Sequence, residues 1–256
     1  MSQPLTTRPI DEGAWWRVTL GGSKGNVLDA ELMDALDAVF REARQDRRLK
    51  AIVLEGAGDH FSFGASVQEH LPGPVEGMIG RFGRLLRAVV DSSVVVLAAV
   101  RGQCLGGALE LVTLSHRIFA NVNAKFGQPE ITLGVFAPAA SVLLPRRIPR
   151  AHAEDLCLTG RIIGSPEAHA IGLVDEVVDG DPADAALAWA RAHLATKSAS
   201  TLRLAARALR GDLAAALGTD LPSVERLYLD ELMQSADAVE GLHAFLEKRP
   251  PQWRDA

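Results

Sequence analysis

The sequence predicts an α/β fold, because short apolar runs typical of strands alternate with longer amphipathic stretches up to about residue 180. From residue 183 onward the apolar residues follow helical spacing only, which predicts a helical C-terminal region. The chain has 256 residues, of which 48% are hydrophobic, so it can bury a large core. We therefore expect an α/β body at 1–195, followed by a helical region at 196–256.

The predicted strands are short and apolar, and a glycine or a polar turn follows most of them. They are Trp15–Leu20, 50–56, 93–102, two strands within 116–127, and 173–180. The first predicted helix begins after Asp29, a good N-cap residue, and a second begins near Gly106. The C-terminal helices are predicted at 183–196, 200–209, 221–235 and 237–248. Asp237 and Glu240 are expected to form a capping box at the start of the last helix.

Composition excludes several classes of function. The net charge is −5 and no basic stripe is present, which argues against nucleic-acid binding. The longest apolar run, 94–100, has seven residues, whereas a membrane helix needs about 20. The two cysteines and the scattered histidines show no metal-ligand spacing, and the first residues lack an apolar signal core. We expect a soluble cytoplasmic protein with no metal, no membrane partner and no nucleic-acid partner.

Two glutamates stand in apolar surroundings. Glu110 lies in the stretch "GQCLGGALELV", and Glu130 lies in "KFGQPEITLG". Carboxylates in such places are either paired structural ions or a working acid and base, because an isolated buried charge is costly. Spacing alone leaves both interpretations open.

Glycines precede the first of these glutamates. Gly106 and Gly107 lie where a buried strand is predicted to turn into a helix, so a ligand can approach bare backbone N–H groups. A second glycine turn, "FSFGASV", follows the strand at 50–56 and offers another N–H group. Two such donors suit a thioester oxygen that becomes an enolate, and one donor contributes about 3 kcal/mol. Glycine turns before helices are also common structural features of α/β folds.

Three segments resemble the enoyl-CoA hydratase/isomerase (crotonase) superfamily. They are "HFSFGASVQEH", "GQCLGGALELVTLSHRIFANVNAKFGQPEITLGV" and "EGLHAFLEKRPPQW", and the resemblance runs nearly end to end. It implies a spiral core of ββα units with a C-terminal helical trimerisation region. Relatives of this kind form trimers that often pair into hexamers.

The resemblance assigns roles to four positions. The thioester oxygen of the family is held by two backbone N–H groups, which match Ala65 and Gly107. Hydratases carry two catalytic glutamates, which match Glu110 and Glu130. Because both are retained, water addition is favoured, with Glu110 activating the water and Glu130 exchanging a proton with the substrate.

The resemblance also implies a coenzyme A site, and coenzyme A is part of the substrate rather than a separate cofactor. In relatives, a Phe and a Lys of the last helix reach the coenzyme A of a neighbouring subunit, and Phe245 and Lys248 match them. The implied coenzyme A-binding residues are Lys24, Asn26, Val27, Leu28, Phe63, Ala65, Ser66, Val67, Phe245 and Lys248.

The chain departs from the family pattern in three places. Ser66 replaces a frequent Asp, Ala108 replaces the third glycine of the turn, and "VFAPAASVLLP" at 135–145 replaces a glycine-rich stretch. These replacements predict a reshaped acyl pocket walled by Phe136 and Pro138, although neutral drift in a loop is the alternative. Together with "HFSFGAS…EHLP" they resemble the hydratases that convert cyclohexa-1,5-diene-1-carbonyl-CoA to 6-hydroxycyclohex-1-ene-1-carbonyl-CoA in anaerobic benzoyl-CoA degradation.

Other functions within this resemblance stay open. The main alternative is a general trans-2-enoyl-CoA hydratase of β-oxidation, and an enoyl-CoA isomerase is less favoured because both glutamates are present. A member that binds RNA, or one that binds acyl-CoA without turnover, is the non-enzyme alternative.

Overall fold

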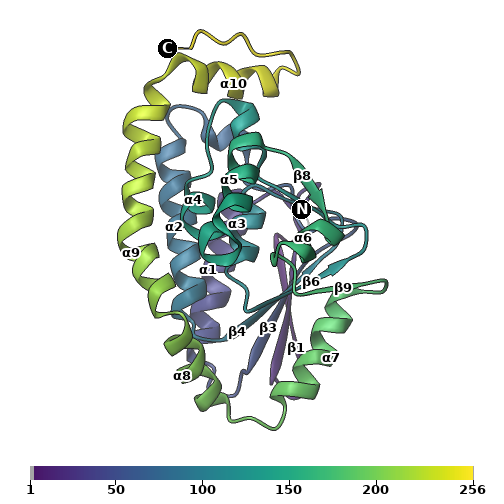
Figure 1. Cartoon of the computed structure of the whole chain (residues 1–256). Coiled ribbons are helices and arrows are strands. Elements are labelled where there is room, and N and C mark those ends of the chain that lie inside the picture. Colours follow the sequence, from purple (N-terminus) through teal and green to yellow (C-terminus); the bar gives the residue numbers. More distant parts are fainter. Residues whose placement is uncertain (1–2, 256) are drawn as a thin grey trace.

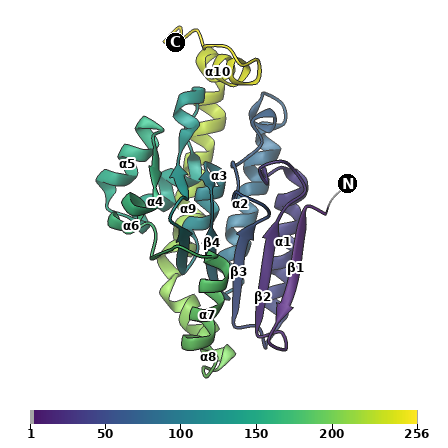
Figure 2. The same ribbon diagram turned by 90° about the vertical axis from the view of Figure 1, so that its right-hand side faces the viewer.

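The computed structural model describes residues 3–255 and is built around a six-stranded sheet with the strand order β1-β2-β3-β4-β6-β9. Every neighbouring pair is parallel except β1 and β2, which form an antiparallel hairpin at the edge (Figure 2). The strands are β1 (Leu5–Ile10), β2 (Trp15–Leu20), β3 (Ala51–Gly56), β4 (Val95–Val100), β6 (Arg117–Asn121) and β9 (Glu176–Val178).

Both faces of this sheet are buried. In β4, Val96, Ala98 and Val100 face the main core, whereas the alternate residues belong to a second core on the opposite face. Alternate residues of a strand point to opposite faces, so a strand covered on both sides reads as a continuous apolar run. Figure 1 shows α1 (Ala30–Gln45) and α2 (Val75–Asp91) on one side and α7 (Pro182–Leu194) on the other.

A smaller sheet of three strands has the order β5-β7-β8, with bounds Gln103–Leu105, Lys125–Gly127 and Ile162–Gly164. Strand β5 leads directly into helix α3 (Gly107–Thr113). The remaining short elements around it are η1 (Val67–His70), η2 (Pro129–Leu133), α4 (Pro138–Arg147), α5 (Arg150–Thr159) and α6 (Ser165–Ala170). This sheet and its helices form the part of the core that holds both glutamates.

The C-terminal region comprises α8 (Ala199–Leu209), α9 (Gly211–Arg226), a π-helical turn η3 (Leu227–Glu231), η4 (Leu232–Gln234) and α10 (Ala236–Leu246). Helix α9 contributes Ala216, Leu217 and Leu221 to the main core. A methyl group on Gly241 would collide with the Leu133 carbonyl, so α10 lies directly against η2. The helical region is therefore continuous with the body of the molecule, and its role in assembly stays a prediction.

Two expectations about elements were wrong, and three strands were missed. The helix predicted at 221–235 begins ten residues earlier, at Gly211, and gives way to the π-helical turn at Leu227. The expected capping box does not form: Ser235 is the N-cap and accepts the N–H of Ala238, while Glu240 pairs with Arg249. Strands β1, β5 and β8 were not predicted at all, whereas β2 and the Asp29 cap were confirmed.

No helix within residues 3–255 combines the length and the apolar character needed to span a membrane.

Candidate active site

The turn between β5 and α3 requires glycine. Gly106 has φ 54° and ψ −129°, a conformation that L side chains rarely adopt, and its N–H donates to the Gly127 carbonyl at 3.0 Å. A methyl group on Gly106 would overlap the carboxylate of Glu130. The glycine therefore serves both the backbone turn and the close approach of the second glutamate.

Two backbone N–H groups meet beside this turn. Leu28 donates to the Gly64 carbonyl at 2.9 Å and accepts from Ser66 at 3.3 Å, which fixes the backbone on both sides of Ala65. A methyl built on Gly107 would lie 3.3 Å from the Ala65 nitrogen. No acceptor within residues 3–255 takes a hydrogen bond from either nitrogen. The pair is arranged to receive one oxygen atom.

Glu110 lies one turn inside α3 and is 4% exposed. Its Oε1 accepts the backbone N–H of Ala140 at 2.6 Å, in the first turn of α4. Burial raises the pKa of the Glu110 carboxyl to about 7, while the N–H groups of Ala140 and Ala139 act in the opposite direction. The group therefore changes charge near neutral pH, as a general base requires.

Glu130 lies in η2 and faces the same space. Burial and, to a smaller extent, the negative charge of Glu110 together raise the pKa of its carboxyl to about 8. Gln128 is buried beside Glu130. When its side-chain amide is oriented with the nitrogen toward Glu130, this nitrogen donates to the Glu130 Oε2 at 3.0 Å. Neither glutamate forms an ion pair with a lysine, arginine or histidine of residues 3–255. This geometry disfavours a pair of structural ions and favours an acid and base.

The two glutamates line an inner cavity of about 30 Å³, room for one or two water molecules. Its wall also includes the two oxyanion positions, Phe82, Phe136 and Pro138. A wider groove of about 580 Å³ adjoins it and shares Ala65, His70 and Glu130 with it.

Comparisons with known proteins agree with this arrangement. The family model described as "Enoyl-CoA hydratase/isomerase" matches residues 15–256. The chain belongs to the enoyl-CoA hydratase/isomerase family. The prediction of a crotonase fold is thereby confirmed, and the family implies that the chain binds an acyl-CoA substrate.

Within this family, the chain is 48% identical over 254 residues to the cyclohexa-1,5-dienecarbonyl-CoA hydratase of Thauera aromatica, covering 99% of this chain and 98% of that protein. It is 36% identical over 232 residues to a probable enoyl-CoA hydratase of Rhizobium meliloti strain 1021, covering 90% of each. The crystal structure of carnitinyl-CoA hydratase from Mycobacterium avium superimposes with a TM-score of 0.87 at 29% identity and covers all of both chains.

Most of the positions expected to bind coenzyme A in this family line the wide groove. They are Val27, Phe63, Ala65, Ser66, Val67 and Phe245. Phe63 and Phe245 are 47% and 53% exposed, so each offers part of its aromatic surface to a ligand. Phe245 lines the groove of its own chain, so α10 contributes to this site without a neighbouring subunit.

The other four positions are not in the groove wall. The Asn26 amide is buried and donates to the carbonyls of Ala57 and His60, both at 2.9 Å, so it holds the loop together. Leu28 is fully buried and positions the Ala65 backbone. Lys24 and Lys248 are exposed and do not line the groove. A contact of these four side chains with a ligand is not supported by their placement.

Sequence reasoning missed several groups at the site. The N–H donors of Ala139 and Ala140 come from the unusual "APAAS" stretch, whose Pro138 is a typical first residue of a helix. His70 lines both the cavity and the groove, and its Nδ1 lies 2.8 Å from the Ser66 carbonyl. Pro138 could have signalled the helix start, but nothing in the sequence marks His70 beyond its place in "EHLP".

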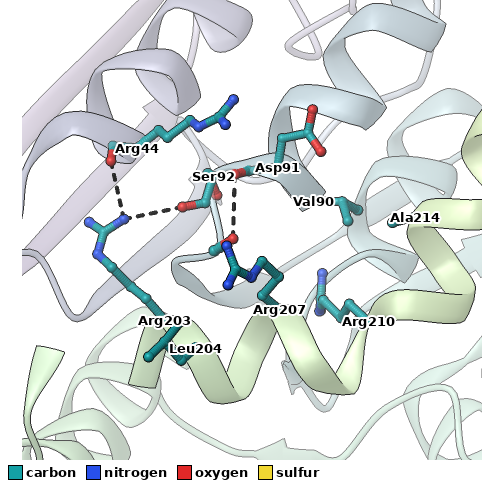
Figure 3. A pocket seen from close by; sticks show the side chains of 10 residues that line it. Arg44, Val90, Asp91, Ser92, Arg203, Leu204, Arg207, Arg210 and Ala214 are labelled. Carbon is teal, nitrogen blue, oxygen red and sulfur yellow. Dashed lines mark hydrogen bonds between the residues drawn. The ribbon is translucent and has the colours of Figure 1, made fainter. Parts of the chain in front are cut away.

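A separate cavity of about 290 Å³ lies among α1, α2, α8 and α9 (Figure 3). Four arginines line it: Arg44, Arg203, Arg207 and Arg210. Arg203 donates to the carbonyls of Ala43 and Ser92 at the ends of two helices, so part of this charge holds the fold together. Among the residues that line this cavity Asp91 carries the single carboxyl, so it offers no pair of acids like the one around Glu110.

Proposed function

We propose that the chain adds water to cyclohexa-1,5-diene-1-carbonyl-CoA and forms 6-hydroxycyclohex-1-ene-1-carbonyl-CoA. Enoyl-CoA hydratase activity follows from family membership and the relatives together. The choice of the cyclic substrate is supported by the 48% identity to a hydratase with that name. It is also supported by Phe136 and Pro138, which line the inner cavity where the family often has flexible glycines.

The arrangement supports a mechanism in which backbone N–H groups polarise the thioester and a glutamate activates a water molecule. The thioester oxygen binds the N–H groups of Ala65 and Gly107, which stabilise the negative charge that develops there. Glu110 in its ionised form takes a proton from the water, which adds to the carbon β to the thioester. Glu130, the second carboxyl beside this water, has the higher pKa and exchanges protons with the reacting groups.

Coenzyme A occupies the wide groove in this proposal. Its apolar wall, with Phe63 and Phe245 on the surface, suits the pantetheine chain and a stacked adenine ring. Lys24 and Lys248 lie outside the groove wall, so they contribute at most long-range charge toward the phosphates. A cytoplasmic location fits such a substrate, and trimers or hexamers built through the C-terminal helices are expected from the family resemblance.

A substrate panel tests the proposal. The purified chain is assayed with cyclohexa-1,5-diene-1-carbonyl-CoA and with crotonyl-CoA, and hydration is followed by absorbance and by product mass. The proposal predicts a kcat/KM at least about tenfold higher for the cyclic thioester, since pocket shape discriminates by about 1–3 kcal/mol. A much higher kcat/KM for crotonyl-CoA assigns the chain instead to general trans-2-enoyl-CoA hydration, which the 36% identity to the Rhizobium protein favours as the second candidate.

A further inference from the structure

A third carboxyl lines the inner cavity together with Glu110 and Glu130. It belongs to Glu225 on α9, one turn after Leu221, which lines the cavity as well. A methyl group on Gly83 of α2 would lie 2.6 Å from the Glu225 Oε1. Glycine weakens the interior of a helix, yet at this position it gives the carboxyl room to lie between α2 and α9. The cavity therefore contains one carboxyl group more than the two that hydration by a pair of glutamates requires.

The Glu225 carboxyl is not held by a direct polar bond within residues 3–255. No hydrogen bond or ion pair joins its carboxyl to any other residue of the described part of the chain. It is partly buried, and burial raises the pKa of this carboxyl, while the charge of Arg87 on α2 offsets part of the effect. The other titratable groups of the cavity wall are Glu110, Glu130 and His70. A partly buried, unpaired carboxyl that faces a reaction site is poised to exchange protons.

The cyclic substrate of the proposed function, on which this inference rests, needs a proton in an unusual place. Water adds at ring carbon 2, because only there does the negative charge reach the thioester oxygen. The second double bond then spreads this charge to carbon 5, and the conjugated product forms only when carbon 5 takes the proton. In a linear enoyl thioester the proton goes instead to the α-carbon, next to the oxyanion hole. The ring therefore requires an acid on its far side, away from the thioester.

We propose that Glu225 is the catalytic acid that delivers a proton to carbon 5 of the ring. The water oxygen bonds to carbon 2, and its proton passes to the pair Glu110 and Glu130. The O–H bond of Glu225 breaks as the C–H bond at carbon 5 forms. The electron pair of the bond between carbons 5 and 6 forms this C–H bond. The enolate C=C pair becomes the double bond between carbons 1 and 6, and the pair on the oxygen re-forms the thioester C=O. The glutamate pair then releases its proton to solvent, and Glu225 regains one, so one water is consumed in total.

His70 is a poorer donor for this step. Burial lowers the pKa of its imidazole, which keeps the ring neutral near pH 7. The contact of Nδ1 with the Ser66 carbonyl places the ring proton on Nδ1, so Nε2 presents a lone pair. A neutral imidazole held this way accepts a proton rather than supplying one.

Substitution of Glu225→Gln tests the assignment, with Glu231→Gln, an exposed glutamate of η3, as the matched control. For cyclohexa-1,5-diene-1-carbonyl-CoA, we expect kcat to fall at least about 100-fold in E225Q and KM to change less than about threefold. The fall in wild-type kcat that accompanies ionisation of Glu225 is a limb of the pH profile that E225Q lacks. In D₂O the wild-type product carries deuterium on the carbon opposite the hydroxyl-bearing carbon.

The outcomes separate the two proposals. If the wild-type chain and E225Q hydrate the cyclic thioester at the same rate, Glu225 is not the acid, while the proposed function stands. Deuterium on carbon 1, next to the hydroxyl-bearing carbon, instead of on carbon 5 also overturns the assignment. If the wild-type chain hydrates crotonyl-CoA and leaves the cyclic thioester unchanged, the proposed function fails and this assignment fails with it.

Discussion

The Glu110 carboxylate and the backbone N–H of Ala140 form a 2.6 Å hydrogen bond that joins α3 to the first turn of α4. The helix N-terminus favours the charged carboxylate, whereas burial favours the neutral acid. Burial has the larger effect, since the Glu110 pKa rises to about 7. The fold therefore holds this group close to the point at which it changes charge, which costs stability and suits acid–base chemistry.

The first prediction concerns the stability cost of Glu110. The pKa of Glu110 in the folded chain, about 7, lies above its ordinary value of 4.5. The stability that the protonated carboxyl gives the folded state is therefore fully present below about pH 4.5, and it is lost as pH rises through about 7. Glutamine at this position cannot ionise. We expect Glu110→Gln to be more stable than the wild type by about 1–3 kcal/mol at pH 8 in urea unfolding. Equal stability of the two chains at pH 8 would contradict this.

The second prediction concerns turnover. Glu110→Gln and Glu130→Gln should each lower the kcat of hydration at least about 100-fold, because each removes a group that exchanges protons in the transition state. Glu231→Gln, which changes an exposed glutamate, should keep wild-type turnover. Near-normal kcat in either active-site variant rules out the two-glutamate mechanism.

The third prediction follows from the interaction between Glu110 and Glu130 and concerns the pKa of Glu130. The negative charge of Glu110 contributes to the raised pKa of Glu130, about 8 in the wild type. In Glu110→Gln this charge is absent, so the Glu130 pKa should fall below about 8. Carbon-13 NMR of labelled glutamate δ-carbons measures both titrations, and an unchanged Glu130 pKa would show that the two carboxyls do not interact.

The fourth prediction separates two effects of glycine at the turn. Gly106→Ala should lower kcat at least about tenfold and destabilise the chain by about 1–3 kcal/mol, because it strains the backbone and displaces the Glu130 carboxylate. Gly58→Ala is the control: Gly58 also has a positive φ, 71°, but no atom lies within 4 Å of the added methyl. Gly58→Ala should therefore lower stability and leave kcat unchanged. Full turnover in Gly106→Ala would refute the role of this turn.

The fifth prediction concerns the groove. Phe245→Ala should raise the KM for an acyl-CoA about tenfold, since it removes an aromatic surface worth roughly 1.5–3 kcal/mol when fully covered. Leu158, 71% exposed on α5 and outside the groove, provides the control Leu158→Ala. Steady-state kinetics with one substrate measure both variants, and an unchanged KM in Phe245→Ala places coenzyme A elsewhere.

Strand β2 was predicted at its observed bounds, because the apolar residues of "WWRVTL" are the ones that the strand buries. Strand β1 was missed because "LTTRPI" lies at the edge, with its four central residues exposed, and shows no apolar pattern. The start of α9 was missed since its interior contains Gly218 and Pro222, which argue against a helix. Packing of α9 against α2 and α4 compensates for these residues, and no local pattern reports such packing.

The sequence by itself identified the family, both glutamates and the two glycine turns, because these depend on residue type and spacing along one short segment at a time. Only the tertiary structure revealed that Ala140 binds Glu110, that Asn26 and Leu28 face inward, and that Glu225 joins the same cavity. These relationships connect residues that lie far apart in the chain. They arise from the packing of α3, α4 and α9 around one core, and the burial that shifts the carboxyl pKa values exists only once that core has formed.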